Sequence, residues 1–359
     1  MHFNTKLLAV LCGLSTAAMA WDTPRNPDLR PSFGFSAGGS SDISPSTDLT
    51  LTESVTGTKG KVTTGADSAT RNLSRQSEDF VTDALFPLTN SLSLQAGGGI
   101  TSTLNKADEL ALKELGTSVS LAATTNDTAL ATAFLTLRYY FLDLNLTGTE
   151  LTDNPDHWPS VALTGSGSDS IYREQTNTTA GVSTPLPGTH TQTLTAASEV
   201  RLPVAQAWTL LLNVSGSSSM TDTPETATAG GDETHLKTIT YGGGAKWYWV
   251  GHNGIHEDNH QNPDRWYSLS LTADGTTTTS GAETTTPVNG NVVQRDVTSS
   301  GYSLSTECRL PLTNNLTLRF GIGGGSSTQQ LPQPDATNPA SKTTSPSING
   351  FLGIRGYFL

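Results

Sequence analysis

Three basic residues that recur at almost constant spacing are the first candidates for chemistry in this chain. Arg138 and Lys246 lie 108 positions apart (246 − 138), and Lys246 and Arg355 lie 109 positions apart (355 − 246). An acid also recurs, four residues before a proline each time, at Asp83, Glu199 and Glu307. Cations and carboxylates at such fixed positions can select charged solutes in a pore. They can also neutralise one another as a purely structural network.

The recurring bases belong to a longer segment that is repeated three times in the sequence. The bases lie in residues 135–142, 243–250 and 352–359, which are rich in apolar and aromatic residues. Two other landmarks recur with them: Asn-Pro-Asp at Asn26, Asn154 and Asn262, and a turn-forming proline at Pro87, Pro203 and Pro311. A fixed period of this kind determines the fold, so it is interpreted first. We place the repeats at approximately 27–154, 155–262 and 263–359.

Each repeat predicts four β-strands. In Ser32–Ser36, Ser160–Thr164 and Ser268–Thr272, apolar and small polar residues alternate with the period of two that is typical of strands. Three repeats give 12 strands, and the last should pair with the first so that no edge stays open. The fold class is therefore all-β: a 12-stranded antiparallel transmembrane β-barrel built from three four-stranded internal repeats. Polar stretches such as 40–75 and 217–233 are expected to be long loops at one end.

The first 20 residues have the features of a cleaved secretory signal. Lys6 supplies the positive start, residues 7–18 the apolar run, and Ala18-Met19-Ala20 the small-x-small cleavage site. Residues 21–29 then form a short periplasmic N-terminal segment, and residues 30–359 form the barrel. Leu11 before Cys12 argues against lipidation, and the single remaining cysteine, Cys308, provides no disulfide framework.

Composition narrows the functional classes. The formal net charge is −12, and the chain has no basic patch, so we expect no nucleic-acid partner. No stretch after the signal approaches the ~18 consecutive apolar residues of a membrane-spanning helix. Charged residues make up only 14% of the chain, which suits strands and polar loops.

Five of the six tryptophans fall near the same predicted ends of the strands. They are Trp158, Trp208, Trp247, Trp249 and Trp266. Amphipathic rings collect at the headgroup level of a membrane, so this clustering predicts an aromatic girdle at the periplasmic side.

From about residue 26 onward, the chain resembles Gram-negative outer-membrane β-barrel proteins of the porin-like kind. Such barrels commonly end in an aromatic residue, whereas this chain ends Tyr357-Phe358-Leu359. The resemblance implies an outer-membrane location with both termini in the periplasm. It also implies contact with outer-membrane lipid and lipopolysaccharide, and insertion by the barrel-insertion machinery. It assigns no specific family, and the oligomeric state stays open.

Alternation places the recurring bases on the inner face of the barrel, because a cation facing lipid costs about 2–4 kcal/mol at midplane. Arg201 and Arg309 share the inner face with two of the acids. The eight charged residues therefore form a belt around the lumen, which either selects solutes or braces the barrel. A tyrosine two residues beyond each base, at Tyr140, Tyr248 and Tyr357, could stack on a solute or fill the lumen.

Metal binding and catalysis have weaker signals. His252, His256 and His260 lie four residues apart, but Gly254 argues against the helix that would align them, so we expect a solvated loop and no cofactor. No Gly-x-Ser-x-Gly motif accompanies the other histidines, so we do not expect an enzyme. The sequence predicts a porin-like channel for passive diffusion of small hydrophilic solutes. The alternative is a structural or surface-interaction (adhesin-like) barrel with an occluded lumen.

Overall fold

The structure, a computed structural model, describes most of the chain after residue 26. The described residues are 27–28, 30–42, 46–48, 60–64, 67–107, 110–112, 119–121, 123–144, 153–179, 182–185, 188–224, 231–254, 262–286, 293–331 and 341–357. The predicted signal of residues 1–20 lies outside them, as do Asn26, His256, His260 and Phe358. In the described ranges, no helix is long and apolar enough to cross a membrane.

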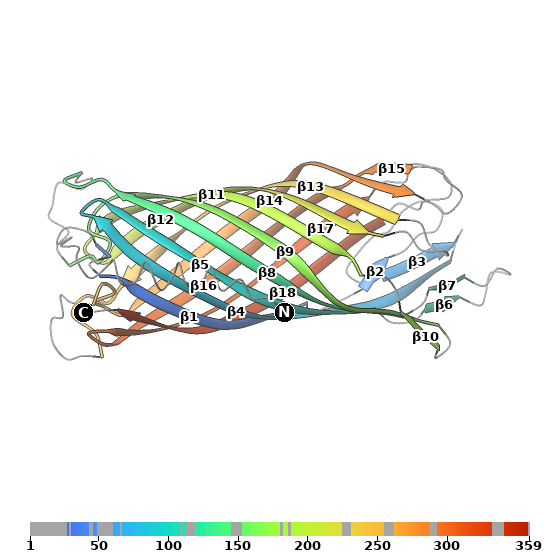
Figure 1. Ribbon diagram of the computed structural model, residues 1–359, viewed down its shortest axis with the longest axis horizontal. Helices are drawn as coiled ribbons and strands as arrows, with labels where there is room; N and C mark the ends of the chain where they lie inside the picture. The colour runs from blue at the N-terminus through green and yellow to red at the C-terminus, as the bar shows by residue number, and fades with distance from the viewer. Residues whose placement is uncertain are drawn as a thin grey trace.

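Twelve antiparallel strands of the described chain form one closed sheet (Figure 1). They are β1 (Ser32–Asp42), β4 (Asp67–Thr89), β5 (Leu92–Ala107), β8 (Ala123–Tyr140), β9 (Ser160–Thr179), β11 (His190–Ala205), β12 (Trp208–Thr223), β13 (Gly231–Tyr248), β14 (Ser268–Thr286), β16 (Thr298–Thr313), β17 (Leu316–Leu331) and β18 (Ser341–Tyr357). Each pairs with its neighbours in this order, and β18 pairs with β1. The predicted 12-stranded barrel and its closure of last strand on first are confirmed.

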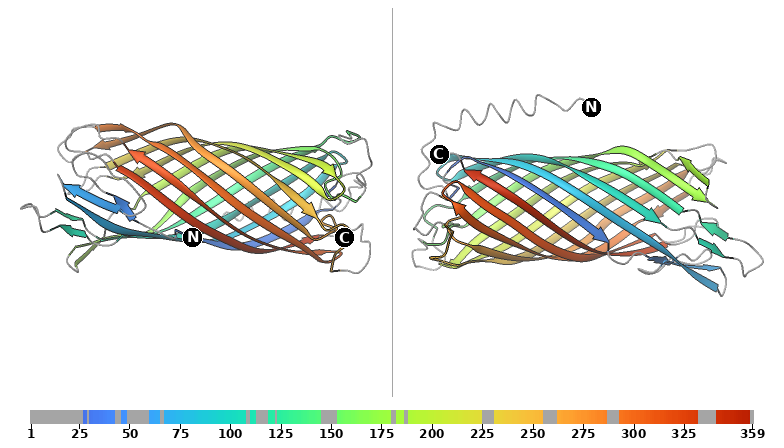
Figure 2. Two further views of the ribbon diagram at one scale, coloured as in Figure 1. Left: turned by 180° about the vertical axis from the view of Figure 1, so that it is seen from behind. Right: turned by 90° about the horizontal axis from the view of Figure 1, so that it is seen from below.

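Six short strands complete the described secondary structure. They are β2 (Ser46–Asp48), β3 (Gly60–Thr64), β6 (Leu110–Leu112), β7 (Val119–Leu121), β10 (Val182–Pro185) and β15 (Val293–Asp296). β2 and β3 pair with β4, β10 with β9, β15 with β14, and β6 with β7. They all lie at one end of the barrel, opposite the marked C-terminus (Figures 1 and 2).

The opposite end of the barrel, here called the short-turn end, carries the tight turns β4–β5, β11–β12 and β16–β17. The pairing register shifts just before each turn, next to Pro87, Pro203 and Pro311. Proline has no N–H to give to the ladder, so it is tolerated where pairing is irregular. Ser32 pairs with Tyr357, so the two ends of the barrel sheet also lie at the short-turn end.

The strands run much further than the sequence predicted. β12 continues to Thr223 and β13 begins at Gly231, so most of the loop expected at 217–233 is strand. Likewise, β4 begins at Asp67, inside the loop expected at 40–75. The loop prediction was wrong there because polarity does not end a strand: threonine suits a pleated surface, and neighbouring backbones satisfy the ladder.

The barrel has its apolar side chains outside and its polar side chains inside. In β8, Leu135, Leu137 and Tyr139 are 42–53% exposed, whereas Arg138 between them faces inward to bind Ser160 and Glu199. The same alternation holds elsewhere, with exposed outward residues at Trp208, Leu210, Leu212, Val214, Phe320, Ile322, Leu352 and Ile354. An exposed apolar surface of this extent requires an apolar environment around the barrel.

Candidate functional site

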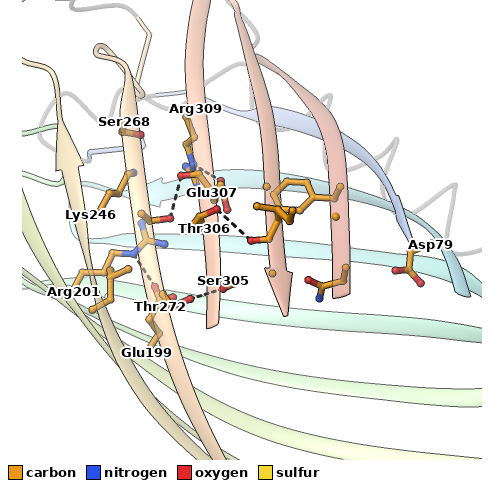
Figure 3. Close-up of a pocket in the computed structure, with 18 residues that line it drawn as sticks. Asp79, Glu199, Arg201, Lys246, Ser268, Thr272, Ser305, Thr306, Glu307 and Arg309 are labelled. Carbon is orange, nitrogen blue, oxygen red and sulfur yellow. Dashed lines mark hydrogen bonds and ion pairs between the residues drawn. The ribbon is translucent and has the colours of Figure 1, made fainter. Parts of the chain in front are cut away.

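A cavity of about 320 Å³, here called the lumen cavity, lies on the inner face of the barrel (Figure 3). Five of the eight charged residues predicted to face the lumen line it: Glu199, Arg201, Lys246, Glu307 and Arg309. Hydroxyl groups line it as well, from Ser268, Ser270, Thr272 and Ser305. The three remaining predicted residues do not line this cavity but are bonded within the same belt.

The first ion pair of the belt joins the strands on which the barrel closes. Arg355 Nη2 on β18 lies 2.5 Å from Asp83 Oδ2 on β4, and the two side chains are 8% and 10% exposed. Arg355 Nη1 donates to Ser32 Oγ on β1 at 2.8 Å, and Gln95 donates to Asp83 at 2.7 Å. Gly34 on β1 makes room for the pair, because a Cβ there would lie 2.6 Å from Asp83 Oδ1.

A second ion pair has the same geometry on β8, β9 and β11. Arg138 Nη2 lies 2.5 Å from Glu199 Oε1, and Arg138 Nη1 donates to Ser160 Oγ at 2.9 Å. Arg201 binds Glu199 as well, through Nε at 2.7 Å, and reaches Asp156 Oδ1 at 3.5 Å. Glu199 is therefore shared between two arginines, one of which also binds an acid outside the strands.

The third recurring base, Lys246, departs from this pattern, because the corresponding acid, Glu307, is bound by arginines. Glu307 accepts hydrogen bonds from Arg309 Nε at 2.7 Å and from Arg319 Nε at 3.0 Å, and Arg309 Nη1 also reaches Asp264 at 3.2 Å. Lys246 lines the lumen cavity beside these groups and is only 8% exposed. Within the described ranges, Lys246 has no ion pair and no hydrogen bond from its side chain.

The Asn-Pro-Asp turns fold inward and pack against the strand ends. Asn154 is fully buried, and its Nδ2 donates to Ala205 O at 2.8 Å, Trp208 O at 3.1 Å and Thr209 Oγ1 at 3.3 Å. Its Oδ1 accepts from the backbone N–H of Asp156 at 2.9 Å. The asparagine thus satisfies the backbone of the β11–β12 turn and also fixes the shape of its own turn.

Asn262 repeats this arrangement at the next connection. It too is fully buried, and its Nδ2 donates to Thr313 O at 2.8 Å and to Thr317 Oγ1 at 3.3 Å. The backbone N–H of Asp264 donates to Asn262 Oδ1 at 2.9 Å. Two connections from different parts of the chain therefore occupy the short-turn end in the same way. The third asparagine, Asn26, lies outside the described residues.

The three recurring tyrosines hold the aspartates of these turns. Their hydroxyls donate at 2.7, 2.5 and 2.6 Å in the pairs Tyr140–Asp28, Tyr248–Asp156 and Tyr357–Asp264. All three rings are at most 6% exposed. Neither reading of the sequence, stacking on a solute or filling space, included this anchoring role.

Asp156 and Asp264 lie outside the strands and are ionised by their surroundings. Burial opposes ionisation, but the positive charges of Lys246 and Arg201 outweigh it and hold the pKa of Asp156 well below its ordinary value. For Asp264, burial is outweighed by Arg309 and Lys246, and its pKa is likewise well below the ordinary value. Both carboxylates are therefore charged at neutral pH, although they are buried.

These shifted pKa values predict acid sensitivity of the short-turn end. A carboxyl whose pKa is lowered by folding stabilises the protein above its unfolded pKa of about 3.9, and that stabilisation is lost as the pH falls further. Each of the two groups adds a slope of up to about 1.4 kcal/mol per pH unit below that value. Chemical unfolding between pH 5 and pH 2 should show a shallower slope for Asp156→Asn/Asp264→Asn than for the unchanged chain. Identical slopes would contradict the assignment.

The five tryptophans predicted to form the girdle lie in different environments. Trp208 and Trp247 stack with ring centroids 6.0 Å apart, and the Trp249 ring lies tilted against Trp247 with centroids 4.2 Å apart. Their place in a girdle stays a prediction. Trp266 is only 3% exposed and donates to Asp153 O at 2.9 Å, so its ring is buried in protein and was wrongly assigned to the girdle. Trp158 lies in an inward-folded turn, half-buried.

Of the three histidines considered as metal ligands, only His252 lies in the described ranges. Its Nδ1 is 3.2 Å from Val250 O.

Sequence reasoning missed several residues of the network. Asp28, Asp156 and Asp264 were noted only as parts of a repeated turn, and nothing in one sequence says that the turn folds inward. Arg319 has a detectable signal, because it lies between Leu318 and Phe320 on an alternating strand and must face the lumen. The buried role of Asn154 and Asn262 has no such signal.

Comparison with one outer-membrane channel of known structure supports the barrel fold. No protein-family model matches the chain, and no curated protein matches it either. An outer membrane channel from Pseudomonas putida F1 superposes with a TM-score of 0.50 at 10% identity, over 91% of this chain and 96% of that one. The translocator domain of the autotransporter NalP from Neisseria meningitidis gives 0.48 at 10% identity, over 99% and 95%. The transport unit of the autotransporter AIDA-I from Escherichia coli gives 0.47 at 12% identity, over 98% and 97%.

Proposed function

We propose that this chain is an outer-membrane barrel that acts as a narrow channel for small hydrophilic solutes. The observation that carries the channel is the lumen cavity of about 320 Å³, lined by charged and hydroxyl side chains inside a barrel with an apolar outer face. A polar interior within an apolar wall is what passage of a hydrophilic solute across a membrane requires.

The membrane placement follows from the surface and the topology. The short-turn end would face the periplasm together with both termini, and the end with the six short strands would face outward. Residues 1–20 would direct export, the barrel-insertion machinery would insert the barrel, and lipid and lipopolysaccharide would surround it. We also propose that the barrel is built from three four-stranded repeats. The recurring tyrosine–aspartate contacts and the matching bonds of Asn154 and Asn262 support this.

Ion conductance of the refolded protein in planar bilayers is the direct test of the channel. Ser270→Trp places a large ring in the lumen cavity and should reduce conductance several-fold. Leu271→Trp is the matched control, because Leu271 is 48% exposed on the outer face and a tryptophan there should leave conductance unchanged. Absence of any current from the unchanged, folded barrel would refute the channel.

The second candidate is a structural or surface-interaction barrel with an occluded lumen. The specific observation in its favour is the packing of the short-turn end, where Asn154, Asn262 and Trp266 are at most 3% exposed. Folded protein without conductance, together with binding to envelope components that survives Ser270→Trp, would select this function over the channel.

A further inference from the structure

The lumen cavity contains a cation whose charge is not matched by a bonded partner. Lys246 lines it and is 92% buried, and among the described residues its ammonium group has no ion pair or hydrogen bond. The ammonium nitrogen lies over the face of the Tyr248 ring, 4.7 Å from its centroid. Asp156 and Asp264 interact with this charge electrostatically but form no ion pair with it. A buried ammonium group without a bonded partner is costly, so a site that keeps one is a candidate for binding an anion.

The missing partner has an identifiable cause. Arg138 and Arg355 each bind an acid two strands away and a serine on the strand between. For Lys246, the corresponding acid is Glu307, and its Oε1 is already bound by Arg309 and Arg319. The corresponding serine, Ser268, lines the cavity instead. A lysine is also shorter in reach than an arginine fork and offers a point charge.

Lys246 is the cation of the cavity lining that has no bonded acid. Three bases, Arg201, Lys246 and Arg309, and three acids, Asp79, Glu199 and Glu307, line the cavity. Arg201 binds Glu199 and Arg309 binds Glu307, whereas Asp79 lies away from Lys246, as Figure 3 shows. A ligand with a single negative charge would pair with Lys246, and Asp79 would disfavour a second negative charge.

The remaining lining is partly polar and partly apolar. Ser268, Ser270, Thr272 and Ser305 contribute hydroxyl groups, and Leu211, Ile322 and Phe351 contribute apolar groups. Thr272 and Ser305 bond to each other at 2.6 Å and Ser270 donates to Glu307 O at 3.4 Å, but a hydroxyl group that makes one bond can still accept another from a ligand hydroxyl. A cavity of about 320 Å³ is at the small end of ligand sites. We propose that Lys246 and the lumen cavity bind small organic monoanions: carboxylates that also carry hydroxyl groups. The inference rests on the proposed function, since the site would make the channel prefer such solutes.

The experiment measures gluconate binding to the full refolded protein in detergent by calorimetry, with glucose as the uncharged comparison. Lys246→Gln should weaken gluconate binding about tenfold or more, because a charge-assisted hydrogen bond is lost, and should leave glucose unaffected. Lys246→Arg should retain gluconate binding. Lys237→Gln, an exposed position on the same strand, is the matched control and should bind gluconate normally.

Unfolding of Lys246→Gln by denaturant separates a lost site from a lost fold. The variant loses a positive charge that stabilises the ionised Asp156 and Asp264, so its denaturation midpoint should fall, but a single cooperative transition shows that the barrel still folds. Unchanged gluconate binding in Lys246→Gln, or no gluconate binding by the unchanged protein, would overturn the proposal. Conductance without gluconate binding refutes this site alone, whereas gluconate binding without conductance refutes the channel alone.

Discussion

Replacing Asp83 with alanine is expected to destabilise the barrel by about 3–5 kcal/mol, because Arg355 would be left buried without its partner. Arg355 is 6% exposed, and Asp83 is the acid that receives its Nη2 hydrogen bond at 2.5 Å. The effect should be large here because the pair spans β4, β1 and β18, where the two ends of the sheet meet. Equilibrium unfolding of the refolded protein in guanidinium chloride measures the loss.

Two controls separate the ion pair from a general effect of charge. Asp79 lies four residues earlier on β4 and has no hydrogen bond or ion pair within the described ranges, so Asp79→Ala should change stability by less than about 1 kcal/mol. The double variant Asp83→Leu/Arg355→Met removes both charges and should recover most of the stability lost in Asp83→Ala. If Asp83→Ala unfolds at the same denaturant concentration as the unchanged chain, the pair does not hold the closure.

Removing the two buried asparagines should open the short-turn end. In Asn154→Ala/Asn262→Ala, the inward turns lose their bonds to the β11–β12 and β16–β17 turns, which leaves backbone acceptors free to bind water. Each unsatisfied buried group costs about 1–3 kcal/mol, enough to favour an outward position of the turns. We expect single-channel conductance in planar bilayers to rise several-fold and larger polymers to enter the lumen.

The control for Asn154→Ala/Asn262→Ala is Asn213, an asparagine within strand β12. Asn213 donates to Asp274 Oδ1 at 2.7 Å across the inner face but does not contact the inward turns, so Asn213→Ala should leave them in place. Its conductance should remain close to that of the unchanged chain. Equal conductance in Asn154→Ala/Asn262→Ala and the unchanged chain, with both folded, would mean that the turns do not limit passage.

The sequence predicted the backbone architecture because it depends on local and periodic signals. Alternation of period two identified the strands, and the recurring segment gave their number and the pairing of β18 with β1. The inward direction of Arg138, Lys246 and Arg355 follows from the same alternation. The strand ends were not predictable in this way, because serine and threonine serve equally in outer strand segments and in loops.

Only the tertiary structure decided which charges meet. The sequence placed the recurring bases and acids in one belt, but their pairing depends on the tilt of the strands around the barrel, which sets which side chains share a height. The inward fold of the Asn-Pro-Asp turns adds Asp156 and Asp264 to the network, from positions that look like ordinary polar loops. Arg319, on the strand next to that of Glu307, donates a hydrogen bond to Glu307 Oε1, which Arg309 also binds, and Lys246 is left without a bonded partner. The sequence alone determined that this chain forms a closed barrel with a charged interior, since the alternation of apolar and polar residues along each strand is a local property of the sequence. Contacts between residues from about 50 to more than 270 positions apart exist only once the sheet has closed. These contacts decided which of the charges brace the barrel and which one lines the cavity without a bonded partner.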